Sequence, residues 1–240
     1  MITPTLILPH QGGGEFLREL DAQQLCCGVL HLGSFLLSQN FLDIQKEYLQ
    51  QVWGRQLEEL EAVLPARQKG DCLQFQAFGE PCELRRQEIF LGGERLTGPE
   101  GILIAMYASY VPNEKLQLLP LKSFKELPDS MPYQGAFSAN AEHILLPHVS
   151  AIRNHQQGLA ARFSGNVNPD PPSGDFSFTL YSLPRIPLYY IFYLPDEEFP
   201  AAVSCLFSAN VIDFLPLAGL ADVAEYTSKK IIEIITEVRS

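Results

Sequence analysis

Apolar residues recur at helical spacing in three long stretches of the chain. The first covers residues 41–64 and stops at Pro65, the second covers 98–110, and the third covers 217–238. Such a stripe is typical of a helix that buries one face. We therefore predict three long helices, preceded by a short helix over residues 22–30.

The second stretch carries strong signals at both ends. Thr97 stands in the position of an N-cap, and Glu100 follows three residues later, where its side chain can reach back to the Thr97 amide. Pro99 falls in the first turn, where its missing N–H does no harm. Pro112 follows the last periodic residue. These signals predict a helix that begins after Thr97 and ends before Pro112.

Two further stretches are interrupted. Residues 137–157 have the composition of a helix, but Pro147 must kink or divide it. Residues 164–175 concentrate glycine, proline, serine, asparagine and aspartate, which favour turns. We expect a divided helix followed by a long loop.

Between the first two helices the apolar pattern changes to a period of two. Leu73, Phe75 and Ala77 alternate with glutamines, and Gly92–Gly93 is a good hairpin turn. Residues 72–96 therefore predict a small antiparallel meander.

Three more strand-like stretches follow the long loop, at residues 176–183, 188–194 and 202–208. The second of these is apolar on both faces, which is typical of a strand in the middle of a sheet. Together the patterns predict an α+β fold, in which helices pack against an antiparallel or mixed sheet built from residues 72–96 and 176–207. We expect residues 1–69 to form an N-terminal helical extension and residues 70–240 to form the α+β domain.

The charge balance narrows the partners. The chain has a formal net charge of −11, with 46% hydrophobic residues and 19% charged residues. An acidic surface repels phosphate backbones and anionic lipids, so we expect neither nucleic acid nor a membrane as a partner. The N-terminus lacks the basic region of a signal peptide, and no apolar run is long enough to span a bilayer. These features predict a cytoplasmic protein; a protein partner stays open, and the oligomeric state is not fixed.

Cysteine and histidine do not form a metal-binding pattern. The five cysteines are irregularly spaced without a CxxC pair, and the histidines lack the spacing of a zinc-binding helix. The sequence therefore predicts reduced thiols, no metal site, and no zinc or iron–sulfur motif of its own; any other cofactor stays unknown.

An acidic triplet follows the predicted central strand. Asp196, Glu197 and Glu198 are adjacent, and Phe199 is expected to return to the core behind them. The carboxylates could bind a divalent metal or act as acid and base. Adjacent charges in a turn are also ordinary, and the interpretation as a solvated turn is favoured.

Three more residues near this strand are candidates for binding a ligand. Alternation places Tyr189 and Tyr193 on one face, where two phenol rings could line a pocket for a flat molecule. Packing within the core is the favoured alternative. Arg185 lies at the far end of the strand, too distant in an extended chain to pair readily with Asp196.

The stretch 183–216 resembles a family known as domain of unknown function 3786. The shared features are the Leu-Pro-Arg-x-Pro step at Leu183–Pro187, the aromatic strand, the acidic Asp196–Phe199, and Leu206–Phe207 at the end of the next strand. The capped helix of 97–110 and the SFKELP stretch from Ser123 also look similar. The resemblance covers roughly residues 70–238.

The resemblance implies an uncharacterised protein of anaerobic bacteria and archaea. It favours a non-enzymatic accessory or ligand-binding module in anaerobic metabolism, associated with corrinoid or iron–sulfur proteins. Two alternatives stay open: a metal-dependent enzyme that uses the Asp196–Glu198 carboxylates, and a structural protein–protein interaction module.

Overall fold

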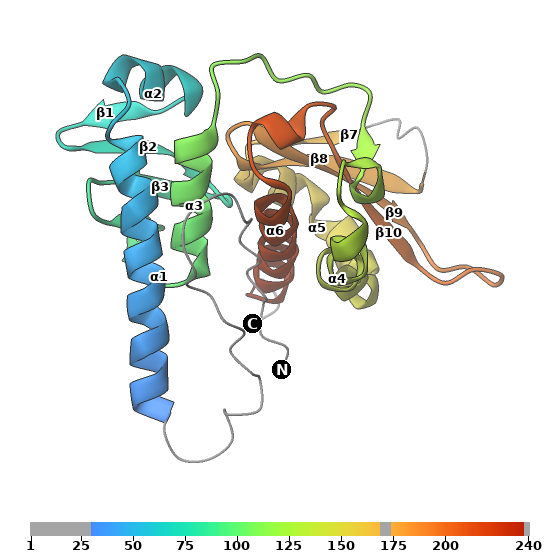
Figure 1. Ribbon diagram of the computed structural model, residues 1–240. Helices are drawn as coiled ribbons and strands as arrows, with labels where there is room; N and C mark the ends of the chain where they lie inside the picture. The colour runs from blue at the N-terminus through green and yellow to red at the C-terminus, as the bar shows by residue number, and fades with distance from the viewer. Residues whose placement is uncertain (1–29, 169–173, 238–240) are drawn as a thin grey trace.

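The computed structural model describes residues 30–168 and 174–237, and they form two five-stranded antiparallel sheets surrounded by helices (Figure 1). The predicted α+β class is confirmed. The sequence predicted one sheet, whereas the N-terminal meander and the C-terminal strands form separate sheets. No helix within these ranges is long and apolar enough to cross a membrane.

The first sheet is the predicted meander with one strand added. Its strands lie in chain order: β1 (Arg67–Lys69), β2 (Cys72–Ala77), β3 (Glu80–Leu84), β4 (Ile89–Leu91) and β5 (Glu94–Arg95). The turn from β4 to β5 has φ of +60° at Gly92 and +91° at Gly93, a region that favours glycine. The period-two pattern therefore predicted both the strands and their turn.

The second sheet has the order β6-β10-β9-β8-β7. Its strands are β6 (Lys122–Ser123), β7 (Asn166–Asn168), β8 (Phe176–Leu183), β9 (Ile186–Tyr193) and β10 (Ala202–Phe207). Tyr190 in β9 lies opposite Phe178 in β8 and Cys205 in β10. The strand predicted to be central is therefore flanked on both sides.

Six α-helices accompany the sheets in the described ranges: α1 (Leu30–Val52), α2 (Leu57–Val63), α3 (Pro99–Tyr110), α4 (Gln134–Phe137), α5 (Val149–Arg162) and α6 (Leu217–Glu237). Short 3-10 turns cover Phe124–Glu126, Met131–Tyr133, His143–His148 and Val211–Asp213, and a π-helical turn covers Ser138–Glu142. Pro147 lies inside the 3-10 turn before α5, so the predicted division of this helix is confirmed.

The prediction of one helix over residues 41–64 is wrong. α1 runs through Asn40 to Val52 and a second helix, α2, starts at Leu57. Long-range hydrogen bonds stabilise the connection between α1 and α2. The Trp53 indole donates to the Arg85 carbonyl at 3.0 Å, and Arg55 Nη1 donates to the Ala108 carbonyl at 3.1 Å. The predicted helix at 22–30 lies almost wholly outside the described residues.

The predicted cap of α3 is displaced by one residue. Gly98 is the N-cap, and no side chain there makes a capping hydrogen bond, so the proposed capping box at Thr97 is wrong. The bounds of the helix agree with the sequence, because Pro99 starts it and Pro112 lies beyond its end. α3 is buried on nearly every side, which explains its apolar composition.

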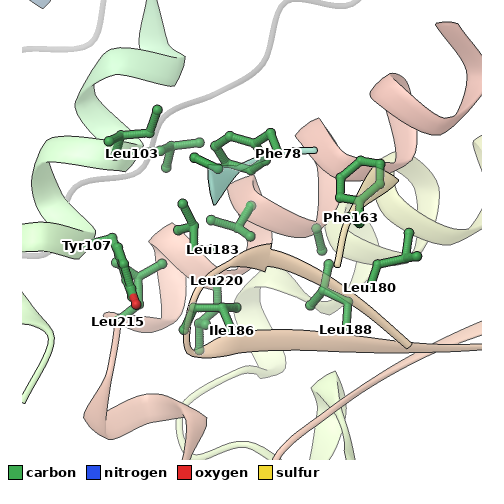
Figure 2. Close-up of a cluster of buried hydrophobic side chains, with 14 of the residues drawn as sticks. Phe78, Leu103, Tyr107, Phe163, Leu180, Leu183, Ile186, Leu188, Leu215 and Leu220 are labelled. Carbon is green, nitrogen blue, oxygen red and sulfur yellow. The ribbon is translucent and has the colours of Figure 1, made fainter. Parts of the chain in front are cut away.

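The two sheets share one hydrophobic core. Phe78 after β2, Leu103 and Tyr107 of α3, and Leu183 and Ile186 of the second sheet gather in one cluster (Figure 2). A backbone hydrogen bond of 2.6 Å from the Phe78 amide to the Ser182 carbonyl joins the sheets directly. The core therefore continues across the boundary between the sheets.

An ion-pair cluster closes one side of this boundary. Glu80 Oε1 of β3 forms ion pairs with Lys230 Nζ of α6 at 2.6 Å and with Arg162 Nη2 of α5 at 3.4 Å. Both partners belong to the C-terminal half of the chain, so the cluster links it to the first sheet.

Candidate functional site

The acidic triplet lies in the turn that connects β9 and β10. Asp196 Oδ1 accepts hydrogen bonds from the amides of Glu198 at 2.9 Å and Phe199 at 2.7 Å. The Asp196 amide in turn donates to the Phe199 carbonyl at 3.0 Å. One carboxylate therefore fixes the turn, as aspartate does in an Asx-turn, and Glu197 and Glu198 extend into solvent.

The base of this turn is also held in place. The Leu194 amide donates to Asp175 Oδ2 at 2.7 Å, and the Asp175 amide donates to the Phe192 carbonyl at 2.8 Å. The chain ahead of β8 thus braces the end of β9. These contacts reduce the conformations open to the turn.

Two aromatic rings on this turn face solvent. Phe199 is 66% exposed and Tyr193 is 38% exposed. The prediction that Phe199 returns to the core is therefore wrong, because the Asp196 turn ends at Phe199 and the next strand begins only at Ala202. We call residues 193–200 the hairpin tip; Figure 1 shows the β9–β10 hairpin extending outward beyond the helices.

Tyr189 and Tyr193 lie on the face of β9 opposite to the helices, as alternation predicts. Tyr189 is half-buried, and its hydroxyl lies 3.1 Å from the hydroxyl of Ser177 on β8. Tyr190, on the other face, is fully buried and shares a hydrogen bond of 3.1 Å with Ser228 of α6. Burial raises the pKa of Tyr190 well above its ordinary value, so its hydroxyl stays protonated.

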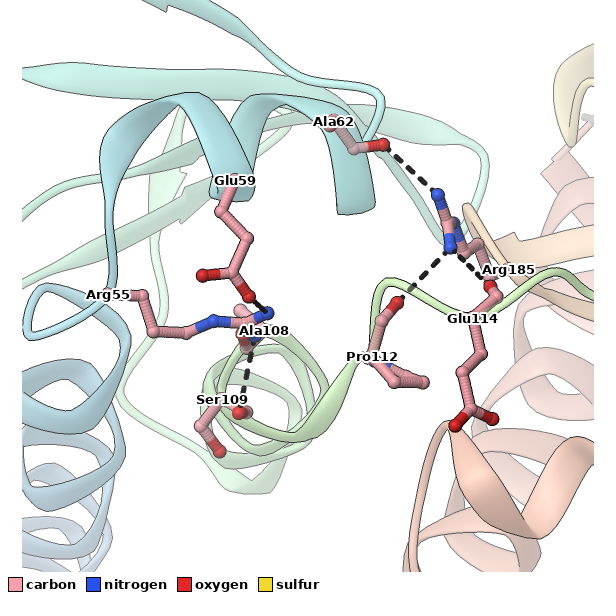
Figure 3. Close-up of polar contacts among 8 residues, drawn as sticks. All are labelled: Arg55, Glu59, Ala62, Ala108, Ser109, Pro112, Glu114 and Arg185. Atoms are coloured by element: carbon pink, nitrogen blue, oxygen red, sulfur yellow. Dashed lines mark hydrogen bonds and ion pairs between the residues drawn. The ribbon is translucent and has the colours of Figure 1, made fainter.

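Arg185 connects three separate segments (Figure 3). Its Nη1 donates to the carbonyls of Pro112 at 3.2 Å and Glu114 at 2.9 Å, and its Nη2 donates to the carbonyl of Ala62 at 3.1 Å. Its backbone amide also donates to the Tyr107 hydroxyl at 3.1 Å. The guanidinium thus holds α2 and the segment after α3 against the β8–β9 turn.

The structure therefore divides the six candidate residues into three groups. Tyr193, Asp196, Glu197 and Glu198 lie together on the hairpin tip. Tyr189 is further back on the same sheet, and Arg185 lies at the other end of β9. Within the described ranges, no group of three or more His, Cys, Asp or Glu side chains could hold a metal ion.

The sequence did not point to Asp222, whose charge depends on its surroundings. It lines a pocket between α4 and α6 together with Tyr133, Phe137, Asn140 and Glu225. Burial, followed by the nearby Glu225 carboxylate, raises the pKa of Asp222 to about 7, and Lys229 opposes that rise. The spacing of Asp222 and Glu225 places them on one helix face, but the burial depends on α4, which is distant in sequence.

Cys82 and Cys205 behave as core residues. Both are buried and unbridged, and burial raises the pKa of each thiol. A raised pKa keeps the thiol protonated and unreactive. Cys26 and Cys27 lie outside the described residues.

A comparison with known protein families gives a match over most of the chain. A family model described as "Domain of unknown function (DUF3786)" matches residues 56–230, which begin just before α2 and end within α6. The hairpin tip and Arg185 both fall inside this range. No curated protein and no solved structure matches the chain.

Proposed function

The chain belongs to the DUF3786 family, and we propose that it is a non-enzymatic accessory module that binds a protein partner through its hairpin tip. The observation that carries this proposal is that the Asp196 carboxylate stabilises its own turn and leaves Phe199 exposed. It accepts two amides of its own turn, and the Phe199 ring stays in solvent beside the remaining acids.

An exposed aromatic ring on a fixed turn suits a binding role. Burial of a phenylalanine side chain is worth about 1.5–3 kcal/mol, and buried aromatic residues are frequent anchors of protein interfaces. The bonds from Asp196 and Asp175 restrict the turn before a partner arrives. Less conformational entropy is then lost on binding.

The charge of the tip specifies the chemistry of the partner. Asp196, Glu197 and Glu198 directly precede Phe199, and no basic residue lies between Tyr193 and Pro200. A complementary surface offers an apolar depression flanked by lysine or arginine side chains. Such charge complementarity accelerates encounter and selects the orientation of binding.

The same geometry gives less support to metal-dependent catalysis by the tip. The amides of the turn occupy Asp196 Oδ1, and the three carboxylates stand on a protruding, solvated turn. Catalytic carboxylates usually act inside a cleft that limits access of water. Association with a corrinoid or iron–sulfur protein stays a prediction from the family resemblance, and such a partner would need the surface described above.

The proposal is tested by a photoreactive phenylalanine analogue in place of Phe199 in the full chain, expressed in its native cell. The control carries the analogue at Met131, which is 75% exposed. We expect a discrete crosslinked product from position 199 only, lost when Glu197→Lys and Glu198→Lys are added. Absence of a position-specific product, or a product insensitive to charge reversal, would overturn the proposal.

A further inference from the structure

A second surface of the chain is the chemical complement of the hairpin tip. Residues 115–125 read KLQLLPLKSFK, with Lys115, Lys122 and Lys125 and no acidic residue. In a chain with a net charge of −11, this is a local concentration of positive charge among leucines. We call residues 115–125 the leucine–lysine segment.

The leucine–lysine segment runs along the edge of the second sheet. Lys122 and Ser123 form β6 and pair with the end of β10. Near the start of the segment, the Ala209 amide donates to the Gln117 carbonyl at 2.8 Å, and the Gln117 amide donates to Asn210 Oδ1 at 2.9 Å. The segment is thus fixed to the chain that follows β10.

Two of its apolar side chains are left in solvent, whereas Phe124 is buried in the core. Leu119 is 75% exposed and Leu118 is 47% exposed, and Ile212, two residues after Asn210, is 40% exposed. Lys115 and Lys125 are exposed at the two ends of the segment. The result is an apolar surface flanked by ammonium groups, the kind of surface that the tip requires.

Two acids flank the leucine–lysine segment, Glu114 before Lys115 and Glu126 after Lys125, so residues 114–126 carry three lysines against two glutamates. Glu126 accepts hydrogen bonds from the Ser123 amide at 2.7 Å and the Ser123 hydroxyl at 2.5 Å. These bonds lower the pKa of Glu126 and direct its carboxylate to Ser123 at the end of β6. Glu114 is exposed beside Lys115, and the stretch 114–126 keeps a net charge of +1.

We propose that the hairpin tip of one molecule docks on the leucine–lysine segment of a second copy of the same chain. This inference rests on the proposed function of the tip and names its partner. Phe199 contacts the exposed leucines, and Glu197 and Glu198 face the lysines. Seven large apolar side chains are exposed in the described ranges. Tyr193 and Phe199 belong to one surface and Leu118, Leu119 and Ile212 to the other, and the remaining two are Tyr110 and Met131.

The placement of the two surfaces allows a closed dimer. The tip precedes β10, and the leucine–lysine segment pairs with the end of β10 and with the residues after it. Phe199 and Ala209 are ten residues apart, roughly 30 Å in extended chain. A two-fold axis near the middle of β10 places each tip on the other copy's segment, an isologous arrangement.

The expected dimer is weak and concentration-dependent. Each contact involves a short turn and a short segment, so the interface is at the small end of specific interfaces. We expect a dissociation constant of about 1–100 µM, with association that weakens as salt screens the exposed charges.

Sedimentation velocity of the purified full chain tests the proposal, with three samples compared at about 100 µM. The tip variant carries Glu197→Lys and Glu198→Lys, and the segment variant carries Lys115→Glu and Lys125→Glu. All four side chains are exposed, so both variants should fold, which circular dichroism verifies. We expect each variant alone to dimerise about tenfold or more weakly than the natural chain, because both of its contacts join like charges.

An equimolar mixture of the two variants gives the decisive result. In the mixed dimer a lysine-bearing tip meets a glutamate-bearing segment, and the unchanged tip meets the unchanged segment. We therefore expect the mixture to dimerise as the natural chain does. A natural chain that stays monomeric at 100 µM, or a mixture that stays monomeric, would overturn the inference.

The crosslinking and sedimentation experiments distinguish failure of the proposed partner binding from failure of the proposed dimer. If the crosslink from position 199 joins a different protein while the purified chain is monomeric, the tip binds a partner but that partner is not a second copy. If the crosslink joins two copies of the chain, both proposals are supported. If position 199 gives no specific product and the chain is monomeric, both are wrong.

Discussion

Asp222 shows how one side chain can make stability depend on pH. Its pKa is raised to about 7 from an ordinary value of 3.8, chiefly by burial. The folded state then binds more protons than the unfolded state between about pH 4 and pH 7. The free energy of unfolding should fall as pH rises through this window and stay lower above it.

We predict that Asp222→Asn removes this dependence. At pH 8 the variant should be more stable than the natural chain by about 1–2 kcal/mol, because the amide carries no charge into the half-buried pocket. At pH 4 the two should be similar. Urea unfolding at both pH values measures the difference, and Asp213→Asn, a change of an exposed acid, is the control. An equal gain at both pH values would show that the charge of Asp222 is not the cause.

At the scale of elements, Arg185 connects the β8–β9 turn to two segments that are distant in sequence. The Leu-Pro-Arg-x-Pro step contains the β8–β9 turn, and Arg185 projects from it to the carbonyls of Ala62, Pro112 and Glu114. Arg55 acts similarly at the end of α3 (Figure 3), where it reaches the Ala108 carbonyl and pairs with Glu59 at 2.5 Å. Two arginines thus hold the end of α2 and the end of α3 in place.

We predict that Arg185→Ala lowers the free energy of unfolding by about 1.5–3 kcal/mol, since three hydrogen bonds from a charged donor are lost, one of them part-buried. Arg185→Lys should lie between, because an ammonium cannot reproduce the planar fork. Chemical denaturation measures both. Arg153→Ala, at an exposed position of α5, should change stability by less than about 0.5 kcal/mol. If the Arg185 and Arg153 variants behaved alike, the connecting role would be wrong.

The elements that the sequence predicted well are those whose signals are local. The alternation in residues 72–96 and 176–207 gave the strands, and Pro99 and Pro112 gave the bounds of α3. The break between α1 and α2 was missed because it depends on Trp53 and Arg55 reaching residues more than 30 positions away.

The candidate site was predicted in part for the same reason. A solvated turn at Asp196–Glu198 follows from adjacent charges, and the faces of Tyr189 and Tyr190 follow from alternation. The exposure of Phe199 was missed because it depends on where the Asp196 turn ends. The charge state of Asp222 depends on packing against α4, which no local pattern contains.

At the scale of the whole molecule, the chain has a continuous core and two short surfaces of opposite charge. The core joins both sheets through α3 and α6 (Figure 2). The acidic hairpin tip and the leucine–lysine segment lie at the two ends of one strand, β10. A rigid body with complementary ends can associate through them without changing shape, provided that the tip is as rigid as the sheet.

The measurement that tests this account most directly is ¹⁵N relaxation across the whole chain. The account predicts that the amides of Glu198 and Phe199 have order parameters close to those of β9 and β10, about 0.85, because Asp196 binds both amides. Asp196→Ala should lower them while the rest of the sheet is unchanged. Order parameters below about 0.6 at Glu198 and Phe199 in the natural chain would contradict the account, because the tip would then be a mobile loop.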